Sequence, residues 1–326
     1  MFDPFHAPVL TSARFSRRRL GLLFGGAAAG VAGLAACGND TSALTGSQTN
    51  VDAYDQIILG GPVADAATVD GNAWAKKIKE RGNLITGGTD SGPLFSIKDP
   101  TTGKLTGFDA GLAQLLAHYI TGKTDVNALL ELKVTSVDTR ETMIQNNTVD
   151  TVFATYSITP ERAKKVAFAG PYYRSGNAVM VKADNTDITG VKDLSGKKVA
   201  TQQGSTAPDK IKQEVSDAQI SLFPDDAQCL AALQTGRVDA YVIDQSILIS
   251  DASADKNLKV VGEPFSDDYY GIGVTRSDPS AKQFVNAWLT KVEDDGTWAK
   301  LWKATVGTVV QGEAPKPPEI GSAKGS

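Results

Sequence analysis

Arg162 and the residues before it could hold a carboxylate. The run Ser157-Ile158-Thr159-Pro160-Glu161-Arg162 follows an apolar, β-branched segment and begins a predicted helix, with Thr159 as N-cap and Pro160 as the first helical residue. From this first turn the Arg162 guanidinium could form two parallel hydrogen bonds to a carboxylate, supported by the Ser157 hydroxyl and backbone. The alternative is a structural ion pair between Arg162 and a nearby acidic side chain.

Asp244 ends a second apolar strand, predicted from 238 to 243, and could accept hydrogen bonds from an ammonium group. Its alternative role is to cap the helix that we expect to start near Gln245. A strand end and a helix start also flank Gln202-Gln203-Gly204-Ser205-Thr206, whose N–H groups could bind a carboxylate, although an ordinary turn would look the same. Together with Arg162, these groups suit a free α-amino acid, which carries one carboxylate and one ammonium.

The sequence is poor in groups that could transform a ligand. Of the two histidines, His6 lies in a predicted leader and His118 is predicted to lie on the exposed side of a helix. No spacing of Cys, His and Asp indicates a metal site, no glycine-rich phosphate loop follows a strand, and no Gly-x-Ser-x-Gly elbow occurs. We therefore expect a binding protein without catalytic residues, metal or cofactor, and not an enzyme.

Strand and helix patterns alternate along most of the chain. Strands are predicted at 84–86, 130–134, 149–155, 198–201, 220–223 and 238–243, with helical patterns between them. This alternation predicts an α/β fold, in which helices cover parallel strands.

A short internal sequence repeat indicates two lobes with similar structures. Segments 145–150 and 234–239 share Gln, Val and Asp at a constant offset of 89 positions, and the same offset pairs Thr155 with Asp244. Ligands of open α/β sheets lie beyond the carboxyl ends of the strands, so Thr155 and Asp244 would face a cleft between the lobes. A chance likeness between two common α/β units is the alternative.

Two extended crossings should join the lobes, one at 178–182 and the other at 271–275. We therefore predict a first lobe over residues 70–182, a second lobe over 183–268, and a return of the chain to the first lobe over 269–310. Trp288, Trp298 and Trp302 follow the return at helical spacing. We expect these tryptophans to pack in the core rather than to stack on a ligand.

The first 36 residues have the pattern of an export signal. Arginines at 14 and 17–19 precede a charge-free apolar run at 20–36, which is short for a membrane span and ends in small residues that a peptidase accepts. Ser16-Arg17-Arg18-Arg19-Leu20 resembles the twin-arginine signal, and a general secretory signal fits equally well. Leu34-Ala35-Ala36-Cys37 resembles a bacterial lipobox, so we expect a diacylglycerol on Cys37 and an anchor on the outer face of the cell membrane.

Polar segments flank the predicted lobes. Residues 37–69 are predicted to form a flexible tether, and residues 311–326, with three prolines, are predicted to be disordered or draped on the surface. Loss of residues 1–36, with four arginines and one aspartate, would change the net charge from −4 to −7, which disfavours nucleic acid as a partner. Once Cys37 is acylated, Cys229 has no partner for an intrachain disulfide and is expected to be buried.

Several short runs occur in a fixed order over about 84–302. They are Gly107-Phe108-Asp109, Ser157 to Arg162, Phe168 with Pro171-Tyr172-Tyr173, Lys192 to Lys197, Gln203 to Thr206 and Val238 to Asp244. As an ordered set, they resemble the polar amino-acid branch of the extracytoplasmic solute-binding proteins of ABC importers. Gly296-Thr297-Trp298 makes the chain especially similar to the glutamate and glutamine binding lipoproteins of actinobacteria.

This resemblance implies a type II periplasmic-binding-protein-like fold, with two α/β sheets joined by two crossing strands. The residues that it implies around the α-carboxylate are Arg162, Ser157 and Thr206, in a turn shared with Gln202 and Ser205. Those around the ammonium are Asp244 and the carbonyl of Thr155. Thr89 or Asp90, together with Phe95, would form the wall of the first lobe, and Arg140 would lie near the side chain of the ligand.

The implied function is capture of glutamate or aspartate, with glutamine or asparagine next, by closure of the two lobes. The expected partners are a membrane permease, the ATPase that drives it, and the membrane itself through the lipid anchor; we expect a monomer. Two alternatives would keep the same cleft. One is a ligand sensor for a membrane kinase, and the other is a dehydratase-like enzyme that acts on cyclic amino-acid precursors.

Overall fold

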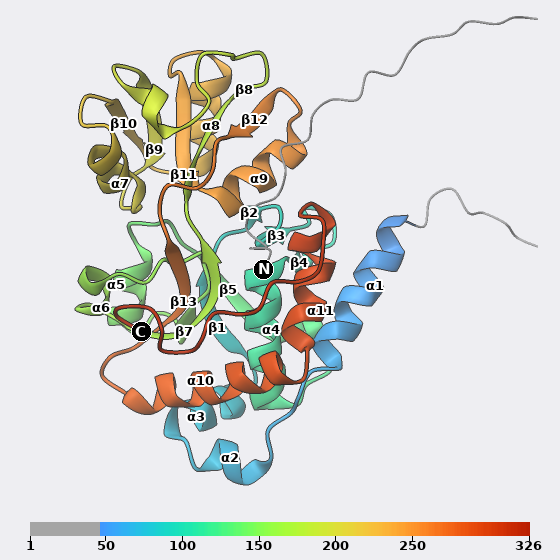
Figure 1. The fold of residues 1–326 in the computed structure, drawn as a ribbon. Coiled ribbons are helices and arrows are strands. Elements are labelled where there is room, and N and C mark those ends of the chain that lie inside the picture. The colour runs from blue at the N-terminus through green and yellow to red at the C-terminus, as the bar shows by residue number, and fades with distance from the viewer. Residues whose placement is uncertain (1–45) are drawn as a thin grey trace, which may run out of the picture.

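Two α/β lobes make up the part of the chain that the structure describes. The structure is a computed structural model, and it describes residues 46–326. Each lobe contains a five-stranded sheet with helices packed around it, and the lobes stack one above the other (Figure 1). Separate clusters of buried apolar side chains fill the two lobes, so each lobe has its own core.

The two large sheets have the same topology. In order across the first sheet, the strands are β5 (Leu130–Val134), β1 (Leu84–Gly88), β6 (Thr151–Val152), β13 (Asp268–Val274) and β7 (Ala167–Ser175). In order across the second, they are β10 (Gln219–Phe223), β9 (Lys198–Gln202), β11 (Ala240–Asp244), β8 (Asn177–Lys182) and β12 (Leu258–Val261). In each sheet the first three strands run parallel, and the last two pair antiparallel with their neighbours. The predicted two-lobed α/β fold is therefore confirmed.

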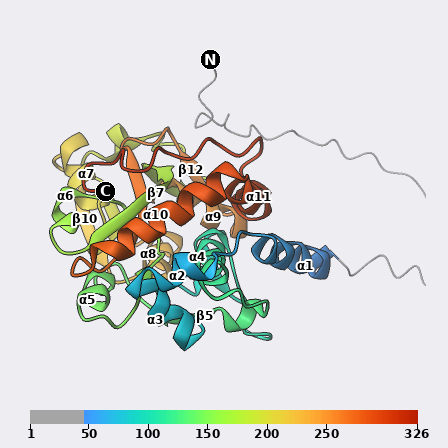
Figure 2. The ribbon, with the colours of Figure 1, turned by 90° about the horizontal axis from the view of Figure 1, so that it is seen from below.

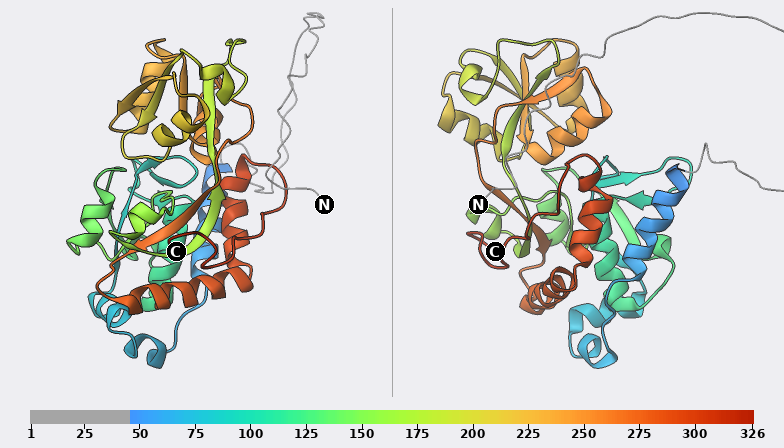
Figure 3. Two further views of the ribbon diagram at one scale, coloured as in Figure 1. Left: turned by 60° about the vertical axis from the view of Figure 1, so that its left-hand side comes forward. Right: turned by 45° about the vertical axis from the view of Figure 1, so that its right-hand side comes forward.

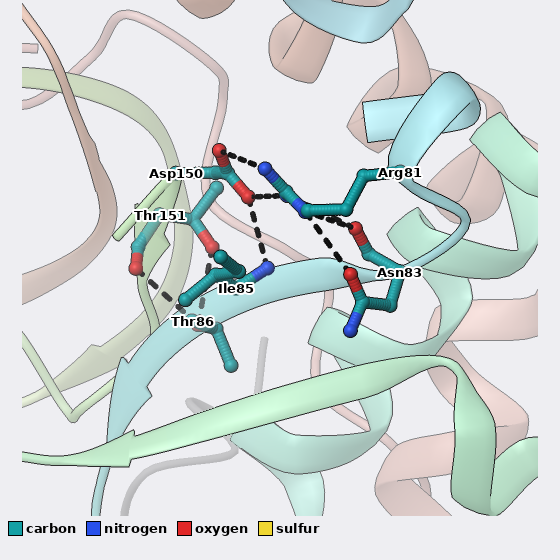
Figure 4. A network of polar contacts seen from close by, with 6 residues as sticks. All are labelled: Arg81, Asn83, Ile85, Thr86, Asp150 and Thr151. Atoms are coloured by element: carbon teal, nitrogen blue, oxygen red, sulfur yellow. Dashed lines mark hydrogen bonds and ion pairs between the residues drawn. The ribbon is translucent and has the colours of Figure 1, made fainter. Parts of the chain in front are cut away.

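The internal sequence repeat at 145–150 and 234–239 corresponds to the same hydrogen-bonding arrangement in both lobes. Before β6, the Asp150 N–H donates to Ile85 O (2.8 Å) and the Asp150 carboxylate accepts from Ile85 N (2.9 Å) (Figure 4). Before β11, the Asp239 N–H donates to Lys198 O (2.8 Å) and the Asp239 carboxylate accepts from Lys198 N (2.8 Å). Arg81 pairs with Asp150 as well (Figure 4). Each aspartate thus ties the start of a central strand to its parallel neighbour.

Helices of both lobes pack against these sheets. Those of the first lobe are α1 (Gly46–Leu59), α2 (Ala66–Asp70), α3 (Ala73–Arg81), α4 (Phe108–Thr121), α5 (Arg140–Gln145), α6 (Pro160–Ala163), α10 (Pro279–Asp294) and α11 (Thr297–Ala304). Those of the second are α7 (Ala207–Glu214), α8 (Asp226–Gln234) and α9 (Gln245–Ala254). Short 3-10 turns lie at η1 (Val126–Ala128), η2 (Val191–Leu194) and η3 (Val306–Thr308). A small sheet of β2 (Ser91–Gly92), β3 (Ser96–Lys98) and β4 (Leu105–Thr106) completes the first lobe.

The last two long helices return to the first lobe, as predicted. Seen from below, α10 runs across the underside of this lobe beside α2 and α3 (Figure 2). Trp288, Trp298 and Trp302 are buried, and the Trp298 indole N–H donates to Tyr172 O (3.0 Å). Core packing of these tryptophans is confirmed. Within the described residues, no helix combines the length and apolar character that a membrane span requires.

The chain crosses between the lobes at Gly176 and between β12 and β13. The predicted boundary after residue 182 is wrong, because β8 pairs with β11 and β12 and so belongs to the second sheet. Residues 178–182 therefore follow the first crossing instead of forming it. The predicted second crossing at 271–275 is wrong as well, because β13 up to Val274 pairs with β6 and β7 in the first sheet. At the crossing itself, a β-carbon on Gly176 would collide with the Ser266 carbonyl, and Asn177 N donates to Ser266 Oγ (2.7 Å). The two crossings therefore lie directly against each other.

The N-terminal boundary of the folded part also needs correction. Residues 37–69 were expected to be a flexible tether, but α1 begins at Gly46 and buries Tyr54 and Ile58. The Tyr54 hydroxyl lies 3.0 Å from Gly107 O and 2.8 Å from Gln114 Oε1. Val51, Tyr54 and Ile58 recur at helical spacing in the sequence, but the surrounding Gly, Ser, Thr and Asn residues favoured a tether. The predicted leader, Cys37 and the start of the tether lie outside the described residues.

The C-terminal segment lies along the first lobe from α11 towards α6 (Figure 3). Gly321 N donates to Gly170 O (2.9 Å), and Ala323 is buried beside Ile158. Disorder was therefore the wrong alternative for residues 311–326, and draping on the surface the right one.

Two predictions about single side chains have opposite outcomes. His118 was expected to be exposed, but it is buried on α4, with Nδ1 2.8 Å from Lys123 O. The reason is that α1, α3, α10 and α11 pack around α4. The apolar stripe on one side of α4 does not predict that other helices also cover its remaining sides. Cys229 is buried and unpaired among the described residues, as predicted.

Candidate ligand-binding cleft between the lobes

Two adjoining cavities lie between the lobes. Their volumes are about 480 and 20 Å³, and Arg140, Thr155, Gln202 and Ile247 line both. The predicted site residues at the small cavity are Arg140, Thr155, Ser157, Arg162, Gln202, Ser205, Thr206 and Asp244. Those at the large cavity are Thr89, Asp90, Phe95, Arg140, Thr155 and Gln202. The structure therefore brings all the predicted site residues together.

Arg162 bridges the two lobes. It lies in the first turn of α6, where Thr159 Oγ1 accepts from the Arg162 N–H (3.2 Å), so the predicted N-cap is confirmed. The buried guanidinium donates to Ser157 O (2.6 Å) in the first lobe and to Gly204 O (2.9 Å) in the second. No carboxylate of the described chain forms an ion pair with Arg162. The structural ion pair considered above is therefore not found.

Arg140 lies beside Arg162 on the same aromatic ring. Its guanidinium carbon is 3.9 Å from the centre of the Tyr156 ring, and that of Arg162 is 5.2 Å away. Arg140 donates to Ala154 O (2.9 Å), while its Nε has no partner. Burial, and then the charge of Arg162, lowers the pKa of Arg140 to about 9. Two buried cations on one ring create a strong local preference for an anion.

Asp244 has a carboxylate that is free to accept hydrogen bonds. It stands at the N-cap position of α9 but makes no capping bond, so the helix-cap alternative fails. Its Oδ1 is buried without a partner. Burial, and then the charge of Asp268, raises the pKa of Asp244 to about 7, although Arg162 and Arg140 oppose the shift. An ammonium group would supply the missing positive charge.

The turn from Gln202 to Thr206 lies at the second-lobe side of the small cavity. Ser205 Oγ donates to Gln202 O (2.7 Å), which fixes the turn, and Thr206 Oγ1 accepts from Asn177 Nδ2 (3.1 Å). Thr206 precedes α7 but makes no side-chain cap. The first N–H groups of α7 therefore have no side-chain acceptor, as anion binding at a helix start requires.

Asp109 positions Thr155, and we assigned it no role from the sequence. Thr155 has a φ of 43°, which is rare for a β-branched residue and needs support from its surroundings. The Asp109 carboxylate accepts from Thr155 N (2.7 Å) and from the Tyr172 hydroxyl (2.7 Å). Asp109 belongs to the run Gly107-Phe108-Asp109, so the only available signal was the resemblance itself.

Two further acidic residues were missed. Asp226 and Asp251 lie on α8 and α9, and both line the large cavity. Nothing in their local sequence separates them from ordinary helix-surface acids, because their burial arises from tertiary packing. Among the described residues, no group of three or more His, Cys, Asp or Glu side chains could hold a metal ion.

The Asp109 contacts generate a stability prediction. Asp109→Ala leaves the buried Thr155 N–H and Tyr172 hydroxyl without their acceptor, so the free energy of unfolding should fall by about 3 kcal/mol. Asp109→Asn keeps an acceptor for Thr155 and should cost about 1 kcal/mol. Urea unfolding followed by tryptophan fluorescence measures both. Equal losses for the two variants would contradict a hydrogen-bonding role of Asp109.

Comparisons with known proteins agree with this architecture. The family model for bacterial extracellular solute-binding proteins, family 3, matches residues 84–307. The ABC transporter glutamine-binding protein GlnH of Bacillus subtilis is 33% identical over 227 residues, which cover 69% of this chain and 82% of GlnH. The glutamate-binding protein GluB of Corynebacterium efficiens is 33% identical over 236 residues, which cover 70% and 80%.

Solved structures give the same picture. An ancestral arginine-binding protein bound to glutamine has a TM-score of 0.62 and 33% identity, and the match covers 70% of this chain and 99% of that one. The ancestral amino acid-binding protein AncCDT-1, a precursor of cyclohexadienyl dehydratase, has a TM-score of 0.62 and 33% identity, with 70% and 97% covered. The chain belongs to the bacterial extracellular solute-binding proteins, family 3.

Proposed function

We propose that this chain is the receptor of an ABC importer and captures a free polar α-amino acid between its lobes. The observation that carries the proposal is the pair Arg162 and Asp244, buried groups of opposite charge that come from different lobes and line one cavity. A zwitterionic head group matches them, with its carboxylate on Arg162 and its ammonium on Asp244. The names of the relatives, which refer to glutamine and glutamate, support an amino acid as the ligand.

The small cavity, at about 20 Å³, holds no more than one water-sized group in this closed arrangement. The bond from Arg162 to Gly204 O occupies the place that we assign to the ligand. We therefore expect the α-carboxylate to replace Gly204 O on the guanidinium, with the lobes slightly wider apart. Closure would then depend on the ligand, which is what delivery to a permease and its ATPase requires.

Binding without chemical change is the proposal that the cleft supports. Burial raises the pKa of Asp109, to about 6, as it raises those of Asp226 and Asp251 on the second-lobe wall of the large cavity. Both hydrogen-bond donors to Asp109 are structural, namely Thr155 N and the Tyr172 hydroxyl. A dehydratase would need an acid and a base at the reacting atoms, whereas Asp244 is the carboxyl that lines the small cavity and Asp226 and Asp251 line the large cavity instead.

On the sequence, Arg140 favoured glutamate or aspartate as the ligand, ahead of glutamine or asparagine. Arg140 lines both cavities and lies against the same ring as Arg162. The charge of Arg140 would therefore stabilise the α-carboxylate of any amino acid as well as a carboxylate on the side chain of the ligand. Arg140 alone does not decide which amino acid binds.

Arg162→Ala should abolish or severely weaken binding of every α-amino acid. Loss of one partner of a buried charge pair costs about 2–5 kcal/mol, or about 30-fold or more in affinity. Isothermal titration of the purified domain measures this loss. Arg237→Ala is the matched control, because Arg237 lies over Phe223 and lines neither of the interlobe cavities. Equal affinities of Arg162→Ala and the wild type would rule out the proposed carboxylate site.

Binding should release a proton near neutral pH. In the empty cleft the pKa of Asp244 is raised to about 7, and a bound ammonium favours the carboxylate, so the pKa falls in the complex. Affinity should therefore rise from pH 6 to pH 8, with a limiting slope of about tenfold per unit below the free-state pKa. Titrations at pH 6.5 in buffers of different ionisation enthalpy count the proton. Proton uptake, or an affinity that does not vary with pH, would contradict the role of Asp244.

We also propose that Cys37 carries the lipid that holds the receptor at the outer face of the membrane. The sequence Leu34-Ala35-Ala36-Cys37 supports this, and the family is extracellular. Labelled palmitate supplied to expressing cells should enter the wild type and a Cys229→Ala variant, but not a Cys37→Ala variant. Cys229 is the only other cysteine, which makes it the matched control. Equal labelling of all three proteins would contradict the anchor.

A further inference from the structure

The large cavity has an acidic wall in the second lobe. Asp226 is the first residue of α8, Asp251 lies in α9, and both line the cavity of about 480 Å³. Asp226 accepts from the Tyr241 hydroxyl (2.7 Å) and from Gln202 Nε2 (3.4 Å). These donors are neutral, so the negative charge of Asp226 is not balanced by its neighbours.

Asp251 lacks even neutral partners. The residue is 6% exposed, and its Oδ2 is buried without a hydrogen bond. Among the described residues, no lysine or arginine forms an ion pair with Asp251 or Asp226. Burial raises the pKa of both carboxyls, and the charge of Asp226 adds to the rise at Asp251. A buried and a half-buried carboxyl without a neighbouring cation are costly to ionise unless a ligand supplies positive charge.

The acidic pair lies within reach of a ligand held by Arg162 and Asp244. Ile247 and Gln202 line both cavities, so the two spaces adjoin at these residues. Asp251 is four residues beyond Ile247 on α9, which is about 6 Å along the helix axis. A long side chain that extends from the head group would follow this direction and end beside Asp251.

We infer that Asp226 and Asp251 form the subsite for the side chain of the ligand, and that this subsite selects a side chain ending in cationic nitrogen. A guanidinium or ammonium would be preferred over a neutral amide, and a carboxylate would be rejected. The inference rests on the proposed function, because it assumes that an α-amino acid occupies the head-group site. It reverses the preference for glutamate or aspartate drawn from Arg140, whose guanidinium already contacts Ala154 O and the Tyr156 ring.

Isothermal titration with arginine, glutamine and glutamate at one ionic strength tests the inference. Wild-type protein should bind arginine at least about tenfold more tightly than glutamate, with glutamine between them. Asp251→Asn should weaken the binding of arginine by about 30-fold or more, because one charged partner of its side chain is lost. The same substitution should leave the affinity for glutamate unchanged or raise it. The difference in affinity between arginine and glutamate would therefore shrink or change sign.

Asp217→Asn is the matched control. Asp217 lies in the second lobe and undergoes the same change of charge, but it is exposed, accepts from Ser195 Oγ (2.7 Å) and lines neither interlobe cavity. Asparagine keeps an acceptor for this bond and salt screens an exposed charge, so this variant should fold and should shift the affinities by less than about threefold. Thermal melting should find Asp251→Asn at least as stable as the wild type, because the change removes an uncompensated buried carboxyl.

The outcomes separate the two proposals. If glutamate binds most tightly and Asp251→Asn leaves the ratio of arginine to glutamate unchanged, the subsite is wrong, while the Arg162 dependence still supports an amino-acid receptor. If no α-amino acid binds to the wild type, the proposed function fails and the subsite fails with it. Tight arginine binding that Asp251→Asn weakens and Asp217→Asn does not is the result that supports the inference.

Discussion

A charged group that is buried needs a partner of opposite charge or a hydrogen bond, and the cleft between the lobes depends on this constraint. Arg162 and Asp244 come from different lobes and lose their water when the lobes meet. Arg162 takes two backbone carbonyls as acceptors, one from each lobe, whereas Asp244 keeps an oxygen without a partner. A cleft that closes over unbalanced charge is stable only when a ligand supplies the balance. This constraint links the proposed lobe closure, the predicted pH dependence and the proposed zwitterionic ligand in one physical account.

The repeated topology of the lobes explains how these groups come to face each other. Asp150 and Asp239 fix the starts of β6 and β11 in the same way, so the polar residues after the two strands, Thr155 and Asp244, occupy equivalent places at the carboxyl ends of their sheets. Gly176 and Ser266 lie in contact where the chain crosses between the lobes, which is where the proposed closure would have its hinge. The geometry of the site is thus a consequence of two similar sheets that share one hinge.

The sequence predicted what local patterns control. Alternating strands and helices, the cap at Thr159 and the charge of Arg162 are local signals, and they led to a two-lobed α/β fold with Arg162 in the cleft. Arg140, Thr89, Asp90 and Phe95 were predicted from the resemblance to the family and not from local patterns. The failures lie where distant segments meet. The burial of His118, the support of Thr155 by Asp109 and the burial of Asp251 all depend on tertiary packing, which periodicity does not report. The boundary at Gly176 was missed for the same reason, since only strand pairing assigns β8 to the second sheet. Helix α1 is the exception, because its apolar residues recur at helical spacing.

The most direct test of the central claim is a crystal structure of the domain with an amino acid bound. The account predicts a closed cleft in which the α-carboxylate lies within hydrogen-bond distance of the Arg162 guanidinium and the ammonium lies within hydrogen-bond distance of Asp244. An amino acid bound elsewhere, such as the cavity of about 260 Å³ beside Tyr173 and Trp302, would contradict it. So would a head group in the cleft that contacts neither Arg162 nor Asp244.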